Sequence, residues 1–250
     1  MKVFELSETN SLIPTEYARG PFGGLQGGAI AALMCAELEG LAREQDLGQP
    51  ISISANFLKA TPFGDVKTEP IGLKTGGRSS TLMNTLTVDE QVRAVLMLST
   101  LKENAVTGMA PVVPYMGSPP DRLNPRGAGA IRPDGPWLMD IFEVRVDPET
   151  QVAWFGVGEE TLKTLTPFCF SLLVADWAHG INRPIQSGYA DPNINLMVHW
   201  LRPPSGSWIG VDSTATWRDG GIGYGIGKLL DQQGEIGCVS MSVAVTKMDR

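Results

Sequence analysis

Histidine and cysteine are scarce in this sequence. Its 250 residues include two histidines and three cysteines, and they contain no HExxH, CxxC or EF-hand pattern, so we expect neither a catalytic metal nor a cofactor. A GxSxG nucleophile elbow is also missing, and with only His179 and His199 available a serine-hydrolase triad has few ways to form. Each cysteine lies in an apolar run, and we expect buried, reduced thiols at all three positions: Cys35, Cys169 and Cys238.

Long apolar runs and an excess of basic residues are lacking too. No stretch approaches the roughly 18 consecutive apolar residues of a membrane span, and the N-terminus has acids but no apolar signal core. The formal net charge is -7, which argues against a broad nucleic-acid surface. We therefore expect a cytoplasmic protein that binds neither membrane nor nucleic acid. A small anionic ligand held by a few local cations is still compatible with this charge.

Residues 106–136 differ in composition from the rest of the chain. They are rich in proline and glycine, which neither continue a helix nor fit the interior of a central strand. We predict that they link two structural units, residues 1–105 and 137–250.

The two predicted units share one order of elements, a helix followed by four strands. In the first unit, a helix over 27–44 with no charge from Ala29 to Ala36 is typical of a buried central helix. The predicted strands of this unit cover 51–60, 66–75, 79–88 and 91–101. The second unit has predicted strands at 139–146 and 150–157, a helix from the N-cap Thr166 to Gly180, and strands at 193–202, 207–217, 221–231 and 235–247.

The two units also align in sequence. Phe57-Leu58-Lys59 matches Trp200-Leu201-Arg202 at an offset of 143 residues, and the same offset places Val95-Leu96 on Cys238-Val239. A register held over about 40 residues, with the same element order, indicates duplication. We predict an α+β fold in which a long antiparallel sheet curls around the central helix of each unit.

Asp176 is the most conspicuous candidate for chemistry. It is the acid within the otherwise apolar predicted helix around Phe170–Ala178, and an ionised carboxylate there is costly unless it is partnered or functional. His179 follows three residues later, on the same helical face. The alternative interpretation is an acid near the helix end that faces a solvent cleft.

Two glycine-rich stretches have different interpretations. Residues 20–29 hold five glycines before the first buried helix, so the N–H groups near Gly27 and Gly28 could hold a carbonyl or an oxyanion at its positive end; a tight turn packed against the sheet is the alternative. Alternating glycines over 221–227 would leave one strand face bare, which favours close packing of a helix over a ligand slot.

The chain resembles the double-hotdog thioesterases, in particular the acyl-CoA thioesterase II family. The resemblance is carried by Phe22-Gly23-Gly24, by Phe57 through Pro62, by Ala175-Asp176 and by Trp200 through Pro203. It implies two tandem hotdog units, each a curved antiparallel β-sheet wrapped around a central α-helix, and a homodimer of such chains. It also implies hydrolysis of acyl-CoA in lipid metabolism.

In that family an Asp, a Thr and a Gln together orient a water against the thioester carbonyl. The Asp corresponds to Asp176, whereas Asn193 stands at the Thr position and Ser242 at the Gln position. We expect Asp176 to be the general base and the other two residues to orient the water. Expected contacts to the substrate, including the CoA phosphates, come from Gly27, Gly28, Lys59, Arg78, His179, Arg202 and Arg218.

Two other functions are open from the sequence. A hotdog hydratase or dehydratase would use Asp176 with His179 on enoyl or hydroxyacyl thioesters. A non-catalytic acyl-CoA binding protein would explain why Asn193 and Ser242 depart from the family pattern.

Overall fold

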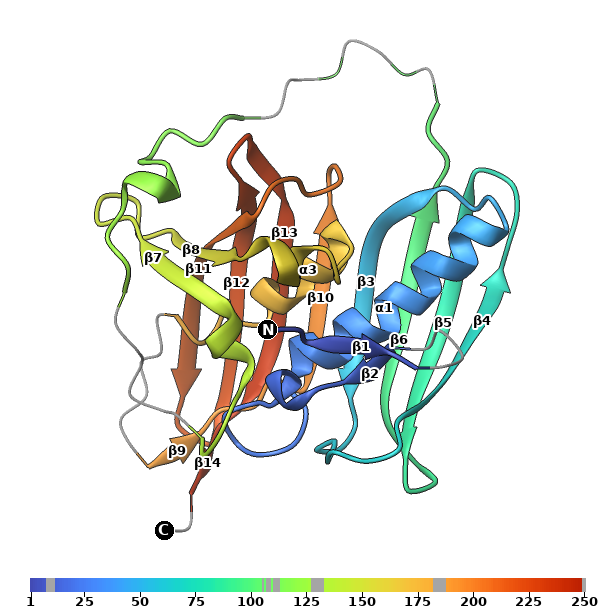
Figure 1. Ribbon diagram of the computed structural model, residues 1–250, viewed down its shortest axis with the longest axis horizontal. Coiled ribbons are helices and arrows are strands. Elements are labelled where there is room, and N and C mark those ends of the chain that lie inside the picture. The colour runs from blue at the N-terminus through green and yellow to red at the C-terminus, as the bar shows by residue number, and fades with distance from the viewer. Residues whose placement is uncertain are drawn as a thin grey trace.

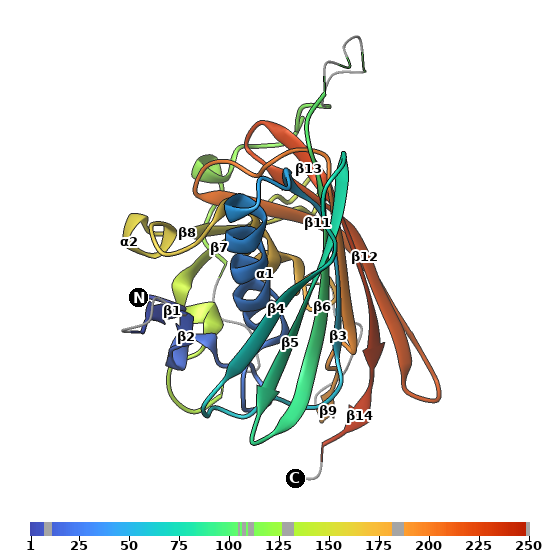
Figure 2. The same cartoon turned by 90° about the vertical axis from the view of Figure 1, so that its right-hand side faces the viewer.

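One continuous sheet organises the molecule. The computed structural model describes residues 1–7, 12–104, 106, 109, 113–126, 133–181 and 188–248. Within them, ten antiparallel strands are hydrogen-bonded in the order β4-β5-β6-β3-β10-β13-β12-β11-β8-β7. The helices α1 and α3 lie on the same side of this sheet (Figure 1), and the side view shows its other face without a covering layer (Figure 2).

The sheet divides into two halves that meet at its centre. The N-terminal half consists of β3 (Gln49–Phe57), β4 (Lys67–Lys74), β5 (Ser79–Val88) and β6 (Gln91–Leu101). The C-terminal half consists of β10 (Asn195–Trp200), β11 (Trp208–Arg218), β12 (Ile222–Asp231), β13 (Gly234–Ala244), β7 (Phe142–Val146) and β8 (Ala153–Val157). The halves join where β3 pairs with β10, for example Ile53 with Val198.

The predicted duplication is confirmed strand by strand. Adding 143 to the bounds of β5 gives the bounds of β12, and adding 143 to those of β6 gives those of β13. The strand order is also symmetric about the β3–β10 junction, since β6, β5 and β4 lie on one side as β13, β12 and β11 lie on the other. The two units are therefore related by an internal twofold arrangement.

Two buried helices pack together over this sheet. α1 (Gly27–Glu44) begins after the N-cap Gln26, whose side chain accepts a hydrogen bond from the Ala29 N–H, and it buries residues along most of its length. α3 (Pro167–Ala175) begins after the N-cap Thr166, with proline at its first position as predicted.

The predicted C-terminus of the second helix was wrong. α3 ends at Ala175, not at Gly180, and Asp176 is its C-cap. The reason is local, because Trp177 N–H and Ala178 N–H donate to the carbonyls three residues back and so tighten the chain into turns.

Smaller departures lie at the ends of the other elements. The first part of the predicted strand 139–146 is a 3₁₀ helix, Leu138–Ile141, and β10 starts at Asn195 instead of 193. The last predicted strand breaks at Val245. The residues of β14 (Thr246–Lys247) were predicted as the end of that strand. The sequence did not predict β1 (Phe4–Leu6), β2 (Leu12–Pro14), α2 (Glu159–Leu162), β9 (Tyr189–Ala190) or the 3₁₀ turns Glu16–Ala18 and Pro120–Arg122.

Part of the predicted linker packs on the C-terminal unit. The Tyr115 hydroxyl donates to Asp147 Oδ2 at 2.6 Å, and its ring meets Trp154 edge-on. Burial alone would raise the pKa of Asp147, but this hydrogen bond and several backbone N–H groups lower it to about 2. Residues 105, 107, 108, 110–112 and 127–132 of the predicted boundary and linker lie outside the described residues, and the three proposed ranges remain a prediction.

The expectation for the cysteines holds at two positions. Cys35 and Cys169 are buried, but Cys238 is exposed. The prediction for Cys238 was wrong because side chains alternate along β13, and the neighbouring Val239 takes the buried side. None of the helices in the described part of the chain has both the length and the apolarity needed to cross a bilayer.

Candidate active site

The C-terminus of α3 meets the N-terminus of α1, and Asp176 lies at this junction. A Cβ atom added to Gly28 would be 2.8 Å from the Cβ of Asp176, and one added to Gly27 would be 3.0 Å from its Oδ1. The glycines at the start of α1 are therefore required for this close approach of the two units. Asp176 is only 3% exposed.

Donors from both units hold the Asp176 carboxylate. Gln26 Nε2 donates to Oδ2, Asn193 Nδ2 donates to Oδ1 at 2.7 Å, and the Gly28 N–H also donates to the carboxylate. The Gln26 amide has a defined orientation, because its Oε1 accepts from the Ala29 N–H at 3.1 Å. The structure thus brings Gly27, Gly28 and Asn193 to Asp176, as the sequence predicted, and adds Gln26, which it did not.

Two opposing influences set the pKa of Asp176. Burial raises the pKa, because it disfavours the charged form, whereas the positive charge of His179 and the hydrogen bonds from Asn193, Gly28 and Gln26 lower it. Burial wins, so the pKa is raised above its ordinary value. A carboxyl group with a raised pKa can accept and return a proton nearer to neutral pH.

His179 lies beside Asp176 on the inner side of the sheet. Its Nε2 is 4.0 Å from Oδ2 of Asp191, which is buried, and its Nδ1 is 3.0 Å from the sulfur of Met241. Gly225 makes room for it, because a Cβ there would be 3.1 Å from the His179 Cβ. The bare strand face predicted from the alternating glycines therefore does receive close packing, although from the turn after α3.

Ser242 does not contact Asp176. Its neighbours Met241 and Val243 are buried, so Ser242 faces the other side of β13. Its N–H donates to Asn195 Oδ1 at 2.7 Å, and its hydroxyl lies 3.4 Å from Asn195 Nδ2. Asn193 Nδ2 in turn donates to the Asn195 carbonyl at 3.2 Å, so Asn195 and Asn193 connect Ser242 to the carboxylate.

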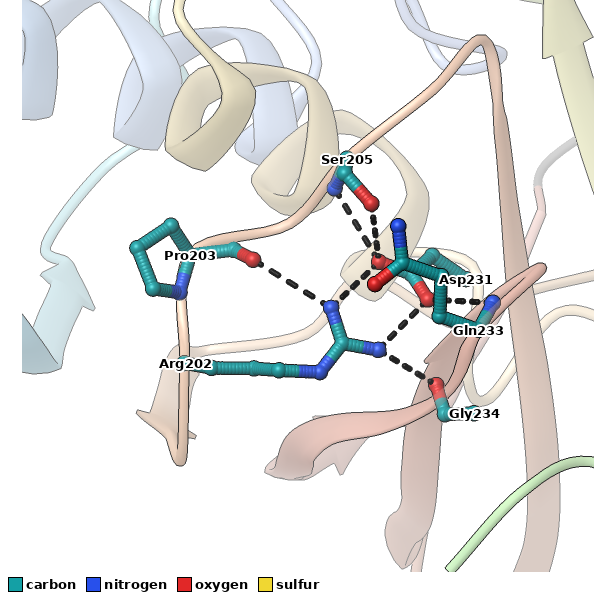
Figure 3. Close-up of polar contacts among 6 residues, drawn as sticks. All are labelled: Arg202, Pro203, Ser205, Asp231, Gln233 and Gly234. Atoms are coloured by element: carbon teal, nitrogen blue, oxygen red, sulfur yellow. Dashed lines mark hydrogen bonds and ion pairs between the residues drawn. The ribbon is translucent and has the colours of Figure 1, made fainter. Parts of the chain in front are cut away.

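The predicted role of Arg202 in binding phosphate conflicts with its contacts. Its guanidinium forms a two-pronged ion pair with Asp231, at 2.6 and 2.5 Å, and also donates to the Gly234 carbonyl (Figure 3). Asp231 is fully buried and accepts further bonds from Ser205 and Gln233. Arg202 therefore holds the end of β10 to the β12–β13 turn, and both terminal nitrogens of its guanidinium are already engaged.

The other predicted cations separate into two groups. Arg78 is exposed in the β4–β5 turn, where its carbonyl accepts from Lys102, and Lys102 pairs with Asp46 just after the C-terminus of α1. Arg78 is thus near the C-terminus of the 18-residue helix α1, whereas Asp176 is at its N-terminus, about 27 Å away along the helix axis. Arg78 therefore lies outside the site.

Lys59 and Arg218 are exposed at the same end of the sheet as Asn193. Lys59 lies two residues beyond Phe57, whose N–H donates to the Ile194 carbonyl. Arg218 pairs with Ile222, which pairs with Ala244 beside Asn193 and Val243. These two cations remain candidates for an anionic ligand.

No group of three His, Cys, Asp or Glu side chains gathers into a metal site in the described part of the chain. Two surface cavities, of about 330 and 230 Å³, are lined by residues other than Asp176. What the structure shows at the site is a buried carboxylate held by neutral hydrogen-bond donors.

Sequence reasoning overlooked three residues around this carboxylate: Gln26, Asp191 and Asn195. Gln26 lies within the glycine-rich stretch 20–29, where a polar residue directly before a buried helix was the available signal for an N-cap. For Asp191 and Asn195 the signal was only a polar residue next to strand β10. Their partners are distant in sequence, so no local pattern indicated the contacts.

Similarity to known families agrees with this architecture. The profile described as acyl-CoA thioesterase N-terminal domain matches residues 14–101, and the one described as acyl-CoA thioesterase C-terminal domain matches residues 103–245. No curated protein sequence matches the chain significantly.

Solved structures share the fold at low sequence identity. A hot dog fold protein of unknown function from Alicyclobacillus acidocaldarius has a TM-score of 0.74 and 16% identity, over 94% of this chain and 92% of that chain. An acyl-CoA thioesterase II, TesB2, from Mycobacterium marinum has a TM-score of 0.70 and 15% identity, over 98% of this chain and 96% of that one. The fold is the predicted α+β double hotdog. Since the two profiles together span most of its length, the chain belongs to the acyl-CoA thioesterase family.

Proposed function

We propose that this protein hydrolyses an acyl-CoA thioester to the free acid and CoA, with Asp176 as general base. The observation that carries the proposal is a buried carboxylate at the junction of two hotdog units, held by Gln26 and Asn193 and with a raised pKa. Such an environment is typical of catalytic carboxylates. Family membership supports the thioester as substrate class.

In the proposed reaction, Asp176 removes a proton from a water as its oxygen attacks the thioester carbonyl. The tetrahedral intermediate then collapses, the C–S bond breaks, and Asp176 returns the proton to the departing CoA sulfur. The Gly28 N–H is already engaged with the carboxylate, so we assign the Gly27 N–H, at the positive end of α1, to the developing oxyanion. Asn193 orients the carboxylate and the water.

Lys59 and Arg218 are the proposed contacts for the CoA phosphates, since both are exposed at the Asp176 end of the sheet. Ser242 is proposed to act indirectly, by holding Asn195 next to Asn193. The proposed setting is acyl-CoA turnover in cytoplasmic lipid metabolism, with the chain acting as a homodimer.

The Asp176→Asn variant tests the proposal. Free-thiol release from short-chain, medium-chain and aryl CoA esters should fall by about 10²- to 10⁴-fold, the usual contribution of a general base. Asp212→Asn is the matched control, because Asp212 is an exposed carboxylate on β11, and its turnover should equal that of the wild type. Undiminished turnover of Asp176→Asn would exclude this mechanism.

One observation favours an alternative, namely that the charge of His179 acts on Asp176. A carboxylate beside an imidazole also suits a hydratase or dehydratase. Loss of enoyl-thioester absorbance without release of thiol would identify that reaction, whereas thiol release excludes it as the main activity. Tight binding of CoA esters with no turnover of either kind would indicate a binding protein.

A further inference from the structure

The loop that joins β3 to β4, residues 58–66, lies beside the turn that precedes α1 (Figure 1). The Leu25 N–H, in that turn, donates to the Thr61 carbonyl in the loop at 2.8 Å. Phe57, the residue before the loop, has its ring against the start of α1, because a Cβ atom added to Gly27 would be 3.1 Å from Phe57 Cε2. The loop therefore starts directly beside the N–H that we assign to the oxyanion.

Three cations gather around this loop. Lys59 belongs to the loop, and its N–H donates to the Arg93 carbonyl at 3.3 Å. The Arg93 guanidinium in turn donates from Nη1 to the Ala60 carbonyl at 3.3 Å. The Arg19 guanidinium lies over the ring of Phe63, 4.8 Å from its centroid, and Phe63 is still 38% exposed. We call Arg19, Lys59, Arg93 and Phe63 the loop cluster.

In the described part of the chain, the cations of the loop cluster have no carboxylate partner. The ion pairs found there involve other residues; Asp65, the acid of the loop, pairs with Lys67, and the acids at 89–90 in the neighbouring turn contact none of the three cations. The buried Nε atoms of Arg19 and Arg93 also lack a hydrogen-bond partner, which is unusual in a folded protein. The loop cluster is therefore a local positive site with unused donors, in a chain where acids outnumber bases by 27 to 20.

We infer that the loop cluster binds the adenosine 3′-phosphate 5′-diphosphate end of CoA, and so selects CoA thioesters over thioesters on carriers that have no nucleotide. Guanidinium groups bind phosphate oxygens through paired N–H donors, which Arg19 and Arg93 provide beside Lys59. The exposed ring of Phe63 offers a surface on which adenine can stack. A phosphate alone would have no use for this ring.

The position of the loop cluster agrees with such a ligand. A thioester carbonyl at the Gly27 N–H directs its CoA arm past the Phe57 ring and past Leu58, which is 56% exposed. The next residue along the chain is Lys59. The selection between carriers rests on the proposed hydrolysis at Asp176, whereas the binding of the nucleotide can be measured without it.

Calorimetry with adenosine 3′,5′-bisphosphate and the full-length protein tests the site without any turnover. Arg19→Met removes the charge and keeps an apolar stem over Phe63, and Phe63→Leu removes the ring. Each should weaken binding by about tenfold, the usual effect of one charge-assisted hydrogen bond or one stacked base. Arg78→Met is the matched control and should leave the affinity unchanged, because Arg78 is an exposed arginine near the other end of α1.

Turnover then tests the selection between carriers. The same acyl group is offered on CoA and on N-acetylcysteamine, which has the thioester and the adjoining amide of the CoA arm but no nucleotide. In Arg19→Met and Phe63→Leu, kcat/KM should fall by about tenfold for the CoA ester and stay at the wild-type value for the short ester. The short ester thus also shows that the variants are folded.

Three results would overturn the inference. They are a wild type that does not bind the bisphosphate at about 1 mM, variants that bind it as tightly as the wild type does, and variants that lose as much activity on the short ester as on the CoA ester. If the variants weaken binding as expected but the wild type hydrolyses neither ester, the proposed hydrolysis fails and the nucleotide site stands.

Discussion

A single carboxylate shows how burial and hydrogen bonding compete in this molecule. Asp176 loses hydration at the α1–α3 junction, and Gln26, Asn193 and the Gly28 N–H replace only part of it. The raised pKa that results also means that the folded state tolerates a proton on Asp176 better than the unfolded chain does. The same feature that suits a proton acceptor therefore reduces stability at neutral pH.

His179 should tune this acceptor. Its positive charge lowers the pKa of Asp176, so in the His179→Asn variant the pKa of Asp176 should rise further. Since the base must be ionised to act, the acidic limb of the kcat/KM profile should move to higher pH, with a several-fold loss of activity just below neutrality and recovery in alkali. Thiol release from one CoA ester across pH 5 to 9 measures this.

His199→Asn is the matched control for that profile. His199 is exposed on the outer side of β10, remote from Asp176, so its replacement should leave the acidic limb in place. A His179→Asn profile that drops uniformly at every pH would show that His179 acts by holding the structure and not by its charge.

Single site residues could be identified from the sequence only where they differ in type from their neighbours. Asp176 was found because it is an acid in an apolar segment, and Gly27 and Gly28 because glycine at a helix start is informative. Gln26 was missed because its partner is 150 residues away. Ser242 was assigned by resemblance, and the alternation of β13 turns it to the other side of the sheet.

Among the elements, strand ends are held by a buried ion pair. Arg202, just after β10, and Asp231, at the end of β12, form the pair, with Ser205 and Gln233 completing the coordination of the carboxylate. Burial alone would raise the pKa of Asp231, but Arg202 and these hydrogen bonds lower it. Its folded-state pKa is below the unfolded value, so its stabilising effect is present at neutral pH and is lost as the pH falls below about 4.

Arg202→Ala should therefore destabilise the protein by about 3 to 5 kcal/mol at pH 7, because it leaves a buried carboxylate uncompensated. The difference in the free energy of unfolding between the variant and the wild type should narrow in acid, where Asp231 takes up a proton. Urea unfolding at pH 7 and at pH 3 measures both effects. If KM for a CoA ester rises sharply while stability is unchanged, Arg202 binds phosphate after all.

Lys102→Ala is the control for this prediction. Lys102 pairs with Asp46 at 2.6 Å, but both side chains are well exposed, and such surface pairs contribute at most about 1 kcal/mol. If Lys102→Ala lowers the free energy of unfolding as much as Arg202→Ala does, burial does not determine how much an ion pair stabilises this protein.

The bounds of some elements were predicted from the sequence, whereas the C-terminus of α3 was not. The predicted strands 79–88 and 91–101 are β5 and β6 with the bounds that they have, and the predicted helix 27–44 is α1. The apolar run after Thr166 gave no signal of its C-terminus. Trp177, Ala178 and Gly180 N–H donate to the carbonyls three residues back, and His179 packs against Gly225. The contact with Gly225 is a tertiary constraint that no local pattern records.

At the scale of the whole molecule, the two hotdog units are repeats in sequence but one body in structure. The β3–β10 pairing makes their sheets continuous, and α1 packs on α3. The proposed site also takes Gln26 and Gly28 from one unit and Asp176 and Asn193 from the other. If one unit unfolds, the other loses its strand pairing at the β3–β10 junction and the packing between α1 and α3.

We therefore predict a single cooperative unfolding transition. All six tryptophans lie at or after residue 137, so tryptophan fluorescence follows the C-terminal unit alone, whereas far-UV circular dichroism follows both. The two signals should give the same midpoint in urea. Leu33→Ala, in the fully buried part of α1, should cost about 2 to 5 kcal/mol and shift the tryptophan midpoint as much as the dichroism midpoint, although no tryptophan lies in the unit that carries it. A tryptophan midpoint that does not move with Leu33→Ala would mean that the units unfold separately and that the junction holding Asp176 contributes little to their coupling.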